Sequence, residues 1–349
     1  MNQIAILCGS QSCEHDISVL TALQVLEKIK NRYNVHILYI TIEKKMYSLK
    51  PIDFINHYRN LSKFLKNKKE ASFIHGGFKC KTKKVFIDSV ILTCHGKNGE
   101  DGILSAMCEF YDLAYVGPQV LTAAITLDKA MTHKILEGKI NMTPYYQVYK
   151  KDFTVDLEAE MAYPLIIKAN TLGSSIGIYP CFLKEDYVRL LYEAFKYDES
   201  VIVESFLEDI KEYNIACYQI KGQYYFSEIE QVIKKEDILT FKDKYEAKYH
   251  KRILNADIDD YIVEMIQKMA LETCELLNVS GVVRMDFMVS NGKVYLGEIN
   301  AIPGALAMYL LDDDVLEMLL FESKRVFLEK KTYISSFKSN IYERTSIKK

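Results

Sequence analysis

The stretch that decides the fold reads Val282-Val283-Arg284-Met285-Asp286-Phe287-Met288, and after a short turn the chain continues as Val294-Tyr295-Leu296-Gly297-Glu298-Ile299-Asn300. Both segments are apolar with polar side chains two residues apart, which is typical of β-strands. The intervening Ser290-Asn291-Gly292 contains the glycine of a tight turn. We therefore predict a β-hairpin over residues 282–300.

Four polar side chains of this hairpin are candidates for a site. Because side chains alternate between the two faces of a strand, Arg284 and Asp286 share one face of the first strand. Glu298 and Asn300 share one face of the second. A three-residue loop, with Gly292 in the left-handed conformation, would place Arg284 opposite Glu298. Asp286 would then lie diagonal to Glu298, whereas a two-residue loop would put the two pairs on opposite faces.

In the first register two carboxylates, an amide oxygen and a guanidinium converge. Oxygen ligands suit Mg²⁺, and an arginine suits a developing oxyanion. The alternative interpretation is a salt bridge on an exposed sheet face.

A second polar stretch resembles a cover for phosphate groups. A predicted strand over 165–168 ends in Lys168 and is followed by Gly173-Ser174-Ser175-Ile176-Gly177. The glycines let the backbone approach a ligand, the amides and hydroxyls donate hydrogen bonds, and the lysine supplies charge. The stretch is not G-x-x-x-x-G-K-[ST], so a P-loop is excluded. An ordinary flexible turn is the alternative.

The first third of the chain alternates short apolar strands with helical patterns. We expect strands at 4–7, 35–41 and 85–93 and helices at 18–30 and 103–111. That alternation predicts a Rossmann-like parallel sheet.

Two polar loops follow the first and third of these strands, at 9–16 and 95–102, where parallel sheets usually bind ligands. A dinucleotide site would need G-x-G-x-x-G, and the first loop contains only Gly9.

From about Thr126 the pattern becomes strand-rich, which indicates an α+β arrangement. The expected elements are strands at 165–168, 201–204, 213–220, 224–230, 282–289 and 293–300 and a helix at 259–277. From Lys330 onward the chain is polar and aperiodic, and we expect a weakly ordered tail.

Composition limits the function classes. The 349 residues suit two or three domains, and a net charge of −2 gives no overall positive field for nucleic acid or an anionic membrane. The first residues do not show the basic segment and following apolar segment of a signal peptide, so we expect none. No apolar run approaches the ~20 residues of a membrane span. Eight cysteines without a C-x-x-C pair favour reduced thiols in a cytoplasmic protein.

Five motifs occur in the order seen in D-alanine–D-alanine ligases, and the chain resembles that family from about residue 3 to about residue 310. The motifs are Glu14-His-Asp-Ile-Ser18, His95-Gly-Lys-Asn-Gly-Glu-Asp-Gly102, Tyr245-Glu-Ala-Lys-Tyr249, Arg284-x-Asp286 and Glu298-x-Asn300-x-x-Pro303-Gly304. Each motif alone is moderately specific for this family, and five motifs in the same order are very specific for it.

The resemblance implies a chain of α/β and α+β parts. A Rossmann-like N-terminal substrate domain (1–119) precedes a two-part ATP-grasp fold, which consists of a central subdomain (120–203) and a C-terminal metal-binding domain (204–333). Residues 334–349 form the weakly ordered tail. The active site lies in the cleft between the domains, with ATP between the central and C-terminal sheets.

The resemblance also implies a set of site residues. The ATP contacts are Lys129, Lys168, Ser174, Glu204, Ser205, Phe206, Leu207, Glu212 and Lys248. The ligands of Mg²⁺ (or Mn²⁺), as two ions, are Asp286, Glu298 and Asn300. The substrate contacts are Glu14, His95, Gly304, Tyr309 and Leu310, and the catalytic group is Glu14, Ser174, Tyr249 and Arg284.

Individual roles follow from the same resemblance. Glu14 receives the ammonium of the first substrate, and His95 lies near its carboxylate. Glu14, Ser174 and Tyr249 form a hydrogen-bonded triad that closes a loop over the site. Arg284, with backbone amides near Gly304, stabilises the tetrahedral oxyanion.

One position departs from the family. The family carries a serine followed by leucine after Asn-x-x-Pro-Gly, to bind the carboxylate of the second substrate, and here Tyr309 precedes Leu310. A phenol is longer and larger than a serine hydroxyl, so the acceptor pocket differs in shape. Packing of Tyr309 as plain core is the alternative. Ala169 also replaces a common proline.

The expected function is therefore ATP-dependent joining of two D-amino acids, D-alanine with D-alanine, through an acyl phosphate for peptidoglycan precursor synthesis. Two alternatives stay open: a different acceptor, such as D-serine, D-lactate or another amino acid, and an inactive nucleotide-binding homologue. Expected partners are D-amino acids and ATP, without nucleic acid or membrane, and relatives suggest a homodimer.

Overall fold

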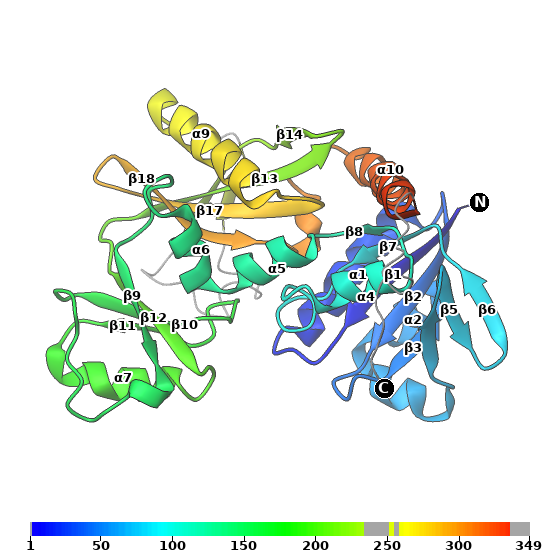
Figure 1. Ribbon diagram of the computed structural model, residues 1–349, viewed down its shortest axis with the longest axis horizontal. Helices are drawn as coiled ribbons and strands as arrows, with labels where there is room; N and C mark the ends of the chain where they lie inside the picture. The colour runs from blue at the N-terminus through cyan, green and yellow to red at the C-terminus, as the bar shows by residue number, and fades with distance from the viewer. Residues whose placement is uncertain (1, 234–250, 255–257, 336–349) are drawn as a thin grey trace, which may run out of the picture.

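The computed structural model describes residues 2–233, 251–254 and 258–335, and Figure 1 shows three β-sheets with helices packed on them. Each sheet is associated with its own buried apolar cluster. The sheets follow one another along the chain, so the site between them draws on residues distant in sequence.

The N-terminal sheet has strand order β6-β5-β4-β3-β2-β1-β7-β8. Its strands are β1 (Gln3–Gly9), β2 (Asn34–Ile40), β3 (Met46–Leu49), β4 (Ala71–Ile74), β5 (Gly77–Cys80), β6 (Lys83–Phe86), β7 (Ser89–Leu92) and β8 (Tyr115–Val116). Its helices are α1 (His15–Ile29), α2 (Pro51–His57), α3 (Leu61–Phe64) and α4 (Ile103–Phe110), with 3₁₀ turns η1 (Tyr58–Asn60) and η2 (Leu65–Asn67).

The predicted Rossmann-like parallel sheet is confirmed for β2, β1, β7 and β8, which pair in parallel. Strands β3 to β6 extend it as an antiparallel meander. The single strand expected at 85–93 is wrong, because the chain leaves β6 at Phe86 and re-enters the sheet at Ser89. Between them Asp88 accepts a hydrogen bond from the Gln3 amide and pairs with Lys324.

The loop after β1 depends on Gly9. Its φ is +88°, and a Cβ there would lie 2.1 Å from the Ile40 carbonyl oxygen. Only glycine fits this turn without a shift of β2. The turn directs the chain from the end of β1 into α1, which begins at His15 beside Glu14.

The central sheet is antiparallel, with order β11-β10-β12-β9. Its elements are β9 (Tyr145–Tyr149), η3 (Lys150–Asp152), β10 (Leu165–Ala169), β11 (Ile178–Cys181), η4 (Lys184–Asp186), α7 (Tyr187–Ala194) and β12 (Ser200–Ser205). Helix α7 covers one face of the sheet, with Leu191 and Ala194 buried against it. The expected strands at 165–168 and 201–204 are confirmed.

The third sheet has order β16-β15-β13-β17-β18, with β14 paired to β13. Its strands are β13 (Lys211–Ile220), β14 (Gln223–Phe226), β15 (Glu230–Ile233), β16 (Lys251–Leu254), β17 (Val282–Ser290) and β18 (Lys293–Asn300). Helices α5 (Val120–Leu127), α6 (Lys129–Leu136) and α9 (Asp260–Leu277) contribute to the same core. The single strand expected at 224–230 is wrong, because β14 and β15 pair separately with β13.

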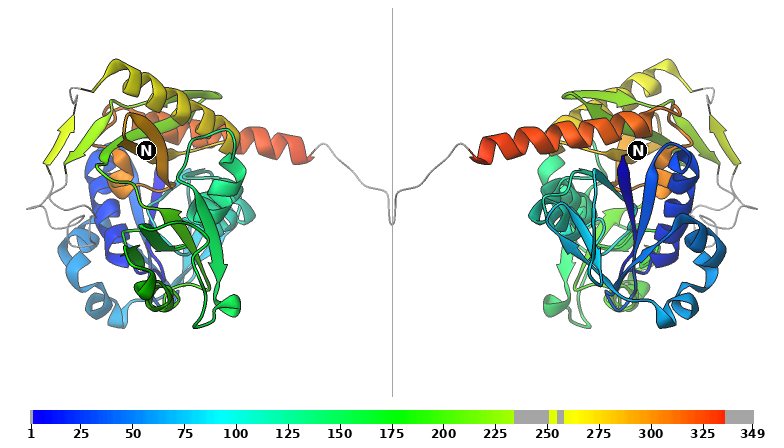
Figure 2. Two further views of the ribbon diagram at one scale, coloured as in Figure 1. Left: turned by 90° about the vertical axis from the view of Figure 1, so that its left-hand side faces the viewer. Right: turned by 90° about the vertical axis from the view of Figure 1, so that its right-hand side faces the viewer.

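The last helix returns to the N-terminal sheet. Helix α10 (Val315–Ser335), which follows the short turn η5 (Gly304–Ala307), buries Leu316 and Leu319 in the N-terminal core. Figures 1 and 2 show α10 beside β7 and β8, with its far end projecting from the molecule. The tail expected from Lys330 is wrong for residues 330–335, which continue α10. The division of the chain at 119, 203 and 333 stays a prediction.

The hairpin forms, but in another register. Asn291 and Gly292 have φ of 50° and 72°, so the loop has two residues, and Ser290 pairs with Lys293. The pairing then shifts at a β-bulge, where Gly297 is the extra residue on β18. The predicted three-residue loop is therefore wrong.

The expected pairing of Arg284 with Glu298 is also wrong. Asp286 lies opposite Glu298, and Arg284 lies opposite Asn300. The common face of all four side chains is confirmed, because the bulge reverses the change of face that a two-residue loop alone would cause.

In the described part of the chain, no helix is long and apolar enough to cross a membrane.

Candidate functional site

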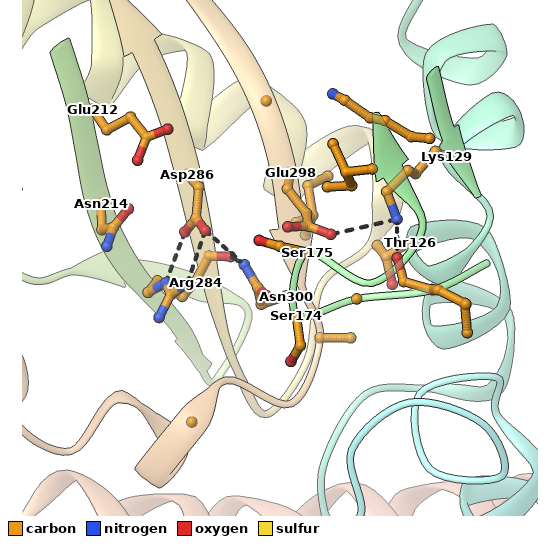
Figure 3. A pocket seen from close by; sticks show the side chains of 18 of the residues that line it. Thr126, Lys129, Ser174, Ser175, Glu212, Asn214, Arg284, Asp286, Glu298 and Asn300 are labelled. Atoms are coloured by element: carbon orange, nitrogen blue, oxygen red, sulfur yellow. Dashed lines mark hydrogen bonds and ion pairs between the residues drawn. The ribbon is translucent and has the colours of Figure 1, made fainter. Parts of the chain in front are cut away.

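One cavity of about 590 Å³ lies where the three sheets meet. Glu14 and His95 reach it from the N-terminal loops, Lys168 from β10, and Glu298 from β18. Figure 3 shows Glu212, Asp286 and Glu298 on three neighbouring strands, with Lys129 and Ser174 approaching from the other side. The cavity is therefore built from all parts of the chain.

Arg284 and Asp286 form the centre of the hairpin face. The Arg284 Nε–H and one Nη–H donate to the two oxygens of Asp286 at 2.7 and 2.8 Å. The Asn300 side-chain amide donates to the same carboxylate at 3.2 Å. Burial opposes the charge of Arg284, but Asp286 and the Tyr309 phenol outweigh it and hold the pKa of Arg284 above its ordinary value. The guanidinium is thus charged and fixed in orientation.

Glu298 faces a lysine. Its Oε1 lies 3.5 Å from the Lys129 Nζ, which also donates to the Leu172 carbonyl at 2.5 Å. Lys129 is the first residue of α6, so the start of this helix positions the ammonium in the wall of the cavity. A cation of the chain itself thus stands beside this carboxylate.

The donor set of the hairpin fits a hard cation. Asp286, Glu298 and Asn300 offer carboxylate and amide oxygens on one sheet face, which is the chemistry that Mg²⁺ prefers. Among the described residues, no group of three or more His, Cys, Asp and Glu side chains could hold a metal. The proposed set differs from such a group because its third member is an amide.

Another lining residue of the cavity is a buried carboxylate surrounded by donors. Glu204, 2% exposed, accepts from Lys168 at 2.8 Å and from Thr143 at 2.7 Å, and His133 lies 3.5 Å from its other oxygen. Burial alone would raise the pKa of Glu204, but Lys168 and His133 outweigh it and lower the pKa. Glu204 is therefore ionised, and Lys168 is oriented toward the cavity wall.

The glycine-serine loop reaches the N-terminal domain. Ser174 and Ser175 have φ of 54° and 60°, a conformation that non-glycine residues adopt rarely. In this conformation the Ser174 hydroxyl donates to Glu14, at the start of α1. The loop over the proposed phosphate region is thereby tied to the proposed ammonium site, as two members of the predicted triad require.

His95 is buried and bonded on two sides. Its Nε2 lies 2.8 Å from the Thr21 hydroxyl, and the ring also bonds to the Ile302 backbone. Burial, helped by the Arg284 charge, lowers the pKa of His95 to about 4. The imidazole is therefore neutral near pH 7.

Glu100 is a half-buried carboxyl close enough to Glu14 to feel its charge. Its oxygens accept from the Gly96 and Ile302 amides at 2.7 and 3.1 Å. Burial, followed by the Glu14 charge, raises the pKa of Glu100 to about 8. Glu100 thus joins the loop after β7 to the loop after β18.

Tyr309 lines the cavity beside Arg284. Its hydroxyl donates to Glu230 at 3.4 Å, and Asn214 donates to the same oxygen at 3.1 Å. Glu230 is fully buried. The phenol thus extends across the cavity wall instead of lying in the apolar core.

The structure brings most predicted site residues together. Those that line the cavity are Glu14, His95, Lys129, Lys168, Ser174, Glu204, Ser205, Phe206, Leu207, Glu212, Arg284, Asp286, Glu298, Asn300, Gly304 and Tyr309. Leu310 does not line it and packs against the N-terminal core. Lys248 and Tyr249 lie outside the described residues.

Several residues with close contacts in the site were missed in the sequence. Among them are Thr21, Glu100, His133, Thr143, Asn214 and Glu230. His133 lies four residues after Lys129, a spacing that places the pair on one face of α6, and Thr21 lies seven residues, about two helical turns, after Glu14, which caps α1. Glu100 lies inside the motif at 95–102. For Thr143 and Glu230 the sequence carries no such signal.

Comparison with known proteins is consistent throughout the chain. Residues 3–118 match the family description "D-ala D-ala ligase N-terminus", and residues 137–312 match "D-ala D-ala ligase C-terminus". The D-alanine–D-alanine ligase of Thermosipho africanus is 34% identical over 98% of this chain and 99% of that protein. That of Nitratiruptor is 33% identical over 97% and 99%.

Solved structures agree in fold. The crystal structure of D-alanine–D-alanine ligase from Helicobacter pylori has a TM-score of 0.79 and 27% identity, covering 92% of this chain and 98% of that one. The VanG D-Ala:D-Ser ligase of Enterococcus faecalis, with a TM-score of 0.76 and 24% identity over 93% and 99%, shares the fold. The predicted ATP-grasp architecture is confirmed. With both family descriptions matched and relatives above 30% identity over nearly the whole chain, this protein belongs to the D-alanine–D-alanine ligase family.

Proposed function

We propose that this chain uses ATP to join two molecules of D-alanine, producing the dipeptide for peptidoglycan precursor synthesis. One observation carries the proposal. A single cavity holds two lysines, Lys129 and Lys168, for phosphate groups, Glu14 for an ammonium, and the Arg284 guanidinium for an oxyanion. Membership of the family supports the same reaction.

The first step forms an acyl phosphate. A carboxylate oxygen of the first D-alanine attacks the γ-phosphorus of ATP, the bond to the bridging oxygen breaks, and ADP leaves. Lys129 and Lys168 neutralise phosphate charge during this transfer. Glu14 holds the ammonium of the same substrate, so the carboxylate points toward the phosphates.

Asp286, Glu298 and Asn300 would hold the divalent metal. We propose that this metal is Mg²⁺ or Mn²⁺ and that two ions bind. When bound, such ions supply charge neutralisation for the phosphate oxygens. The carboxylates are paired with Arg284 and Lys129 here, so these side chains balance the same charge.

The second step forms the peptide bond. The amine of the second D-alanine, after losing a proton, attacks the acyl carbon, and the tetrahedral intermediate collapses with loss of phosphate. Arg284 and the Gly304 amide stabilise its oxyanion. The Ser174–Glu14 contact helps to keep water from the acyl phosphate.

Tyr309 favours a second candidate within the same reaction. Its phenol occupies the region where the acceptor carboxylate would bind, which would suit an acceptor other than D-alanine. A phosphate-release assay with purified protein, ATP and Mg²⁺, over D-alanine, D-serine, D-lactate and L-alanine, separates the two, with products identified by mass spectrometry. D-alanyl-D-alanine with one phosphate per dipeptide supports the proposal. Phosphate release that does not increase with any D-amino acid would refute the proposed function.

The expected homodimer and cytoplasmic location also belong to this proposal. Light scattering of the purified protein tests the first. A monomeric mass at the protein concentrations used in the activity assay would refute the proposed homodimer.

A further inference from the structure

The loop after β18 contains an unusual backbone. Ala305, Leu306 and Ala307 have φ of 55°, 48° and 51°, three consecutive residues in the left-handed region. L-amino acid residues rarely adopt this backbone conformation, and when they do, it is usually as a single residue. Such a turn persists only when its surroundings fix it.

Part of the fixation comes from the turn itself and from the core. The Leu306 amide donates to the Pro303 carbonyl at 2.8 Å, and the Met308 amide donates to the Ala305 carbonyl at 3.1 Å. Leu306 and Ala307 are buried in the N-terminal core. These contacts leave the peptide between Gly304 and Ala305 to be held by something else.

That peptide is held by Thr21, which is 1% exposed on α1. The Ala305 amide donates to the Thr21 Oγ1 at 3.2 Å, and the same oxygen lies 2.8 Å from the His95 Nε2. The neutral ring has one proton, and the Ile302 carbonyl can only accept. The contacts therefore fit when His95 donates to Ile302 and accepts the Thr21 hydroxyl proton.

We propose that Thr21 is a positioning residue that holds the left-handed turn at 305–307 against His95 and thereby aims the Gly304 amide into the cavity. The Ala305 and Leu306 amides are already engaged, with Thr21 and Pro303. Gly304 lines the cavity, and nothing lies within 4 Å of the place of its missing Cβ. The peptide planes on both sides of Gly304 are thus fixed: the Leu306 amide holds the Pro303 carbonyl before it, and Thr21 holds the Ala305 amide after it.

The proposal rests on the proposed function for its catalytic consequence, since the Gly304 amide would serve the second step. The structural part of the proposal does not depend on the proposed function, because the order of the turn can be measured without any substrate. The role of Thr21 in the turn and the proposed function can therefore be refuted independently.

Two substitutions of Thr21 provide the test. Thr21→Val keeps the shape and removes the hydroxyl, and Thr21→Ser keeps the hydroxyl and removes a methyl group. Thr122→Val is a matched control, because Thr122 is a buried helical threonine that donates to the Leu277 carbonyl outside the cavity.

Hydrogen–deuterium exchange of the peptide covering 303–308 is the first readout. We expect about tenfold faster exchange in Thr21→Val and near wild-type exchange in Thr21→Ser and Thr122→Val. Unchanged exchange in Thr21→Val, or equal acceleration in Thr122→Val, would overturn the positioning role.

Steady-state kinetics is the second readout. We expect Thr21→Val to lower kcat about three- to tenfold, with the KM for ATP within twofold, and Thr21→Ser to restore kcat. Equal kcat in wild type and Thr21→Val would overturn the catalytic consequence. If the wild type makes no dipeptide, the proposed function fails, and the exchange measurement alone decides the role of Thr21.

Discussion

Arg284 and Asp286, two residues apart on β17, are joined by two parallel hydrogen bonds of 2.7 and 2.8 Å. The fork fixes the plane of the guanidinium beside Tyr309 and Asn300. A lysine has a single ammonium on a flexible stem and cannot reproduce two parallel bonds. The hairpin therefore holds a charged donor in one orientation before any substrate binds.

Arg284→Lys should lower kcat about a hundredfold while the protein stays folded, because one oriented donor to the oxyanion is lost. Arg325→Lys is the matched control, since Arg325 forms a similar fork with Glu322 on α10, away from the cavity. Circular dichroism checks folding and phosphate release measures kcat. Equal losses in both variants would contradict a role specific to Arg284.

Ser174→Ala should leave the fold intact but uncouple the reaction. It removes a hydrogen bond to Glu14, worth about 0.5–1.5 kcal/mol net, so water reaches the acyl phosphate more often. The measurement is phosphate released per dipeptide formed, which should rise above one. Ser105→Ala, which removes a buried hydroxyl bonded to Pro118, should leave the ratio at one. A ratio of one in both variants would remove Ser174 from loop closure.

Tyr309→Ser should change the KM for the acceptor by roughly ten- to two-hundredfold and the KM for ATP far less, because one pocket contact is exchanged. Tyr309→Phe separates hydroxyl from volume, since it keeps the ring and removes the hydroxyl that bonds to Glu230 and faces Arg284. If all three proteins share one KM for their best acceptor, Tyr309 does not shape that pocket.

Glu100→Gln should change the dependence of stability on pH. The pKa of Glu100 is about 8 in the folded protein, so the unfolded chain loses this proton at lower pH, and ionisation costs the fold stability. The cost starts near the unfolded pKa, grows by about 1.4 kcal/mol per pH unit, and levels off above about pH 8. Urea unfolding at pH 5, 6.5, 8 and 9 should show that the free energy of unfolding of the variant rises relative to that of wild type up to about pH 8. A difference independent of pH would contradict a Glu100 that stays protonated in the folded protein near neutral pH.

Periodic patterns predicted most of the fold. The strands β1, β2, β10, β12 and β13 and helices α1, α4 and α9 occupy the expected ranges within a few residues. The breaks at 87–88 and 227–229 were missed, because neither contains a glycine or proline that would signal the end of a strand. Such breaks depend on partners distant in sequence, such as the Lys324–Asp88 pair.

The hairpin shows why register is harder to predict than strands. Alternation placed Arg284 with Asp286 correctly, but pairing across the hairpin depended on one residue, Gly297. A glycine inside a strand often marks a bulge, and that signal was in the sequence. Contacts such as Thr143 with Glu204 arise from the meeting of separate elements, and no local pattern encodes them.

The isotopic fate of the D-alanine carboxylate tests the central claim most directly. D-alanine labelled with ¹⁸O in both carboxylate oxygens is incubated with ATP, Mg²⁺ and the full chain. Glu298→Gln, which removes one carboxylate charge without changing volume, should lower formation of both products by orders of magnitude and serves as the control. If the acyl phosphate forms, the attacking oxygen leaves with phosphate, so each phosphate carries one ¹⁸O and each dipeptide keeps one in its new amide. Dipeptide formed beside phosphate that carries no ¹⁸O, or ATP hydrolysis without any dipeptide, would contradict the account.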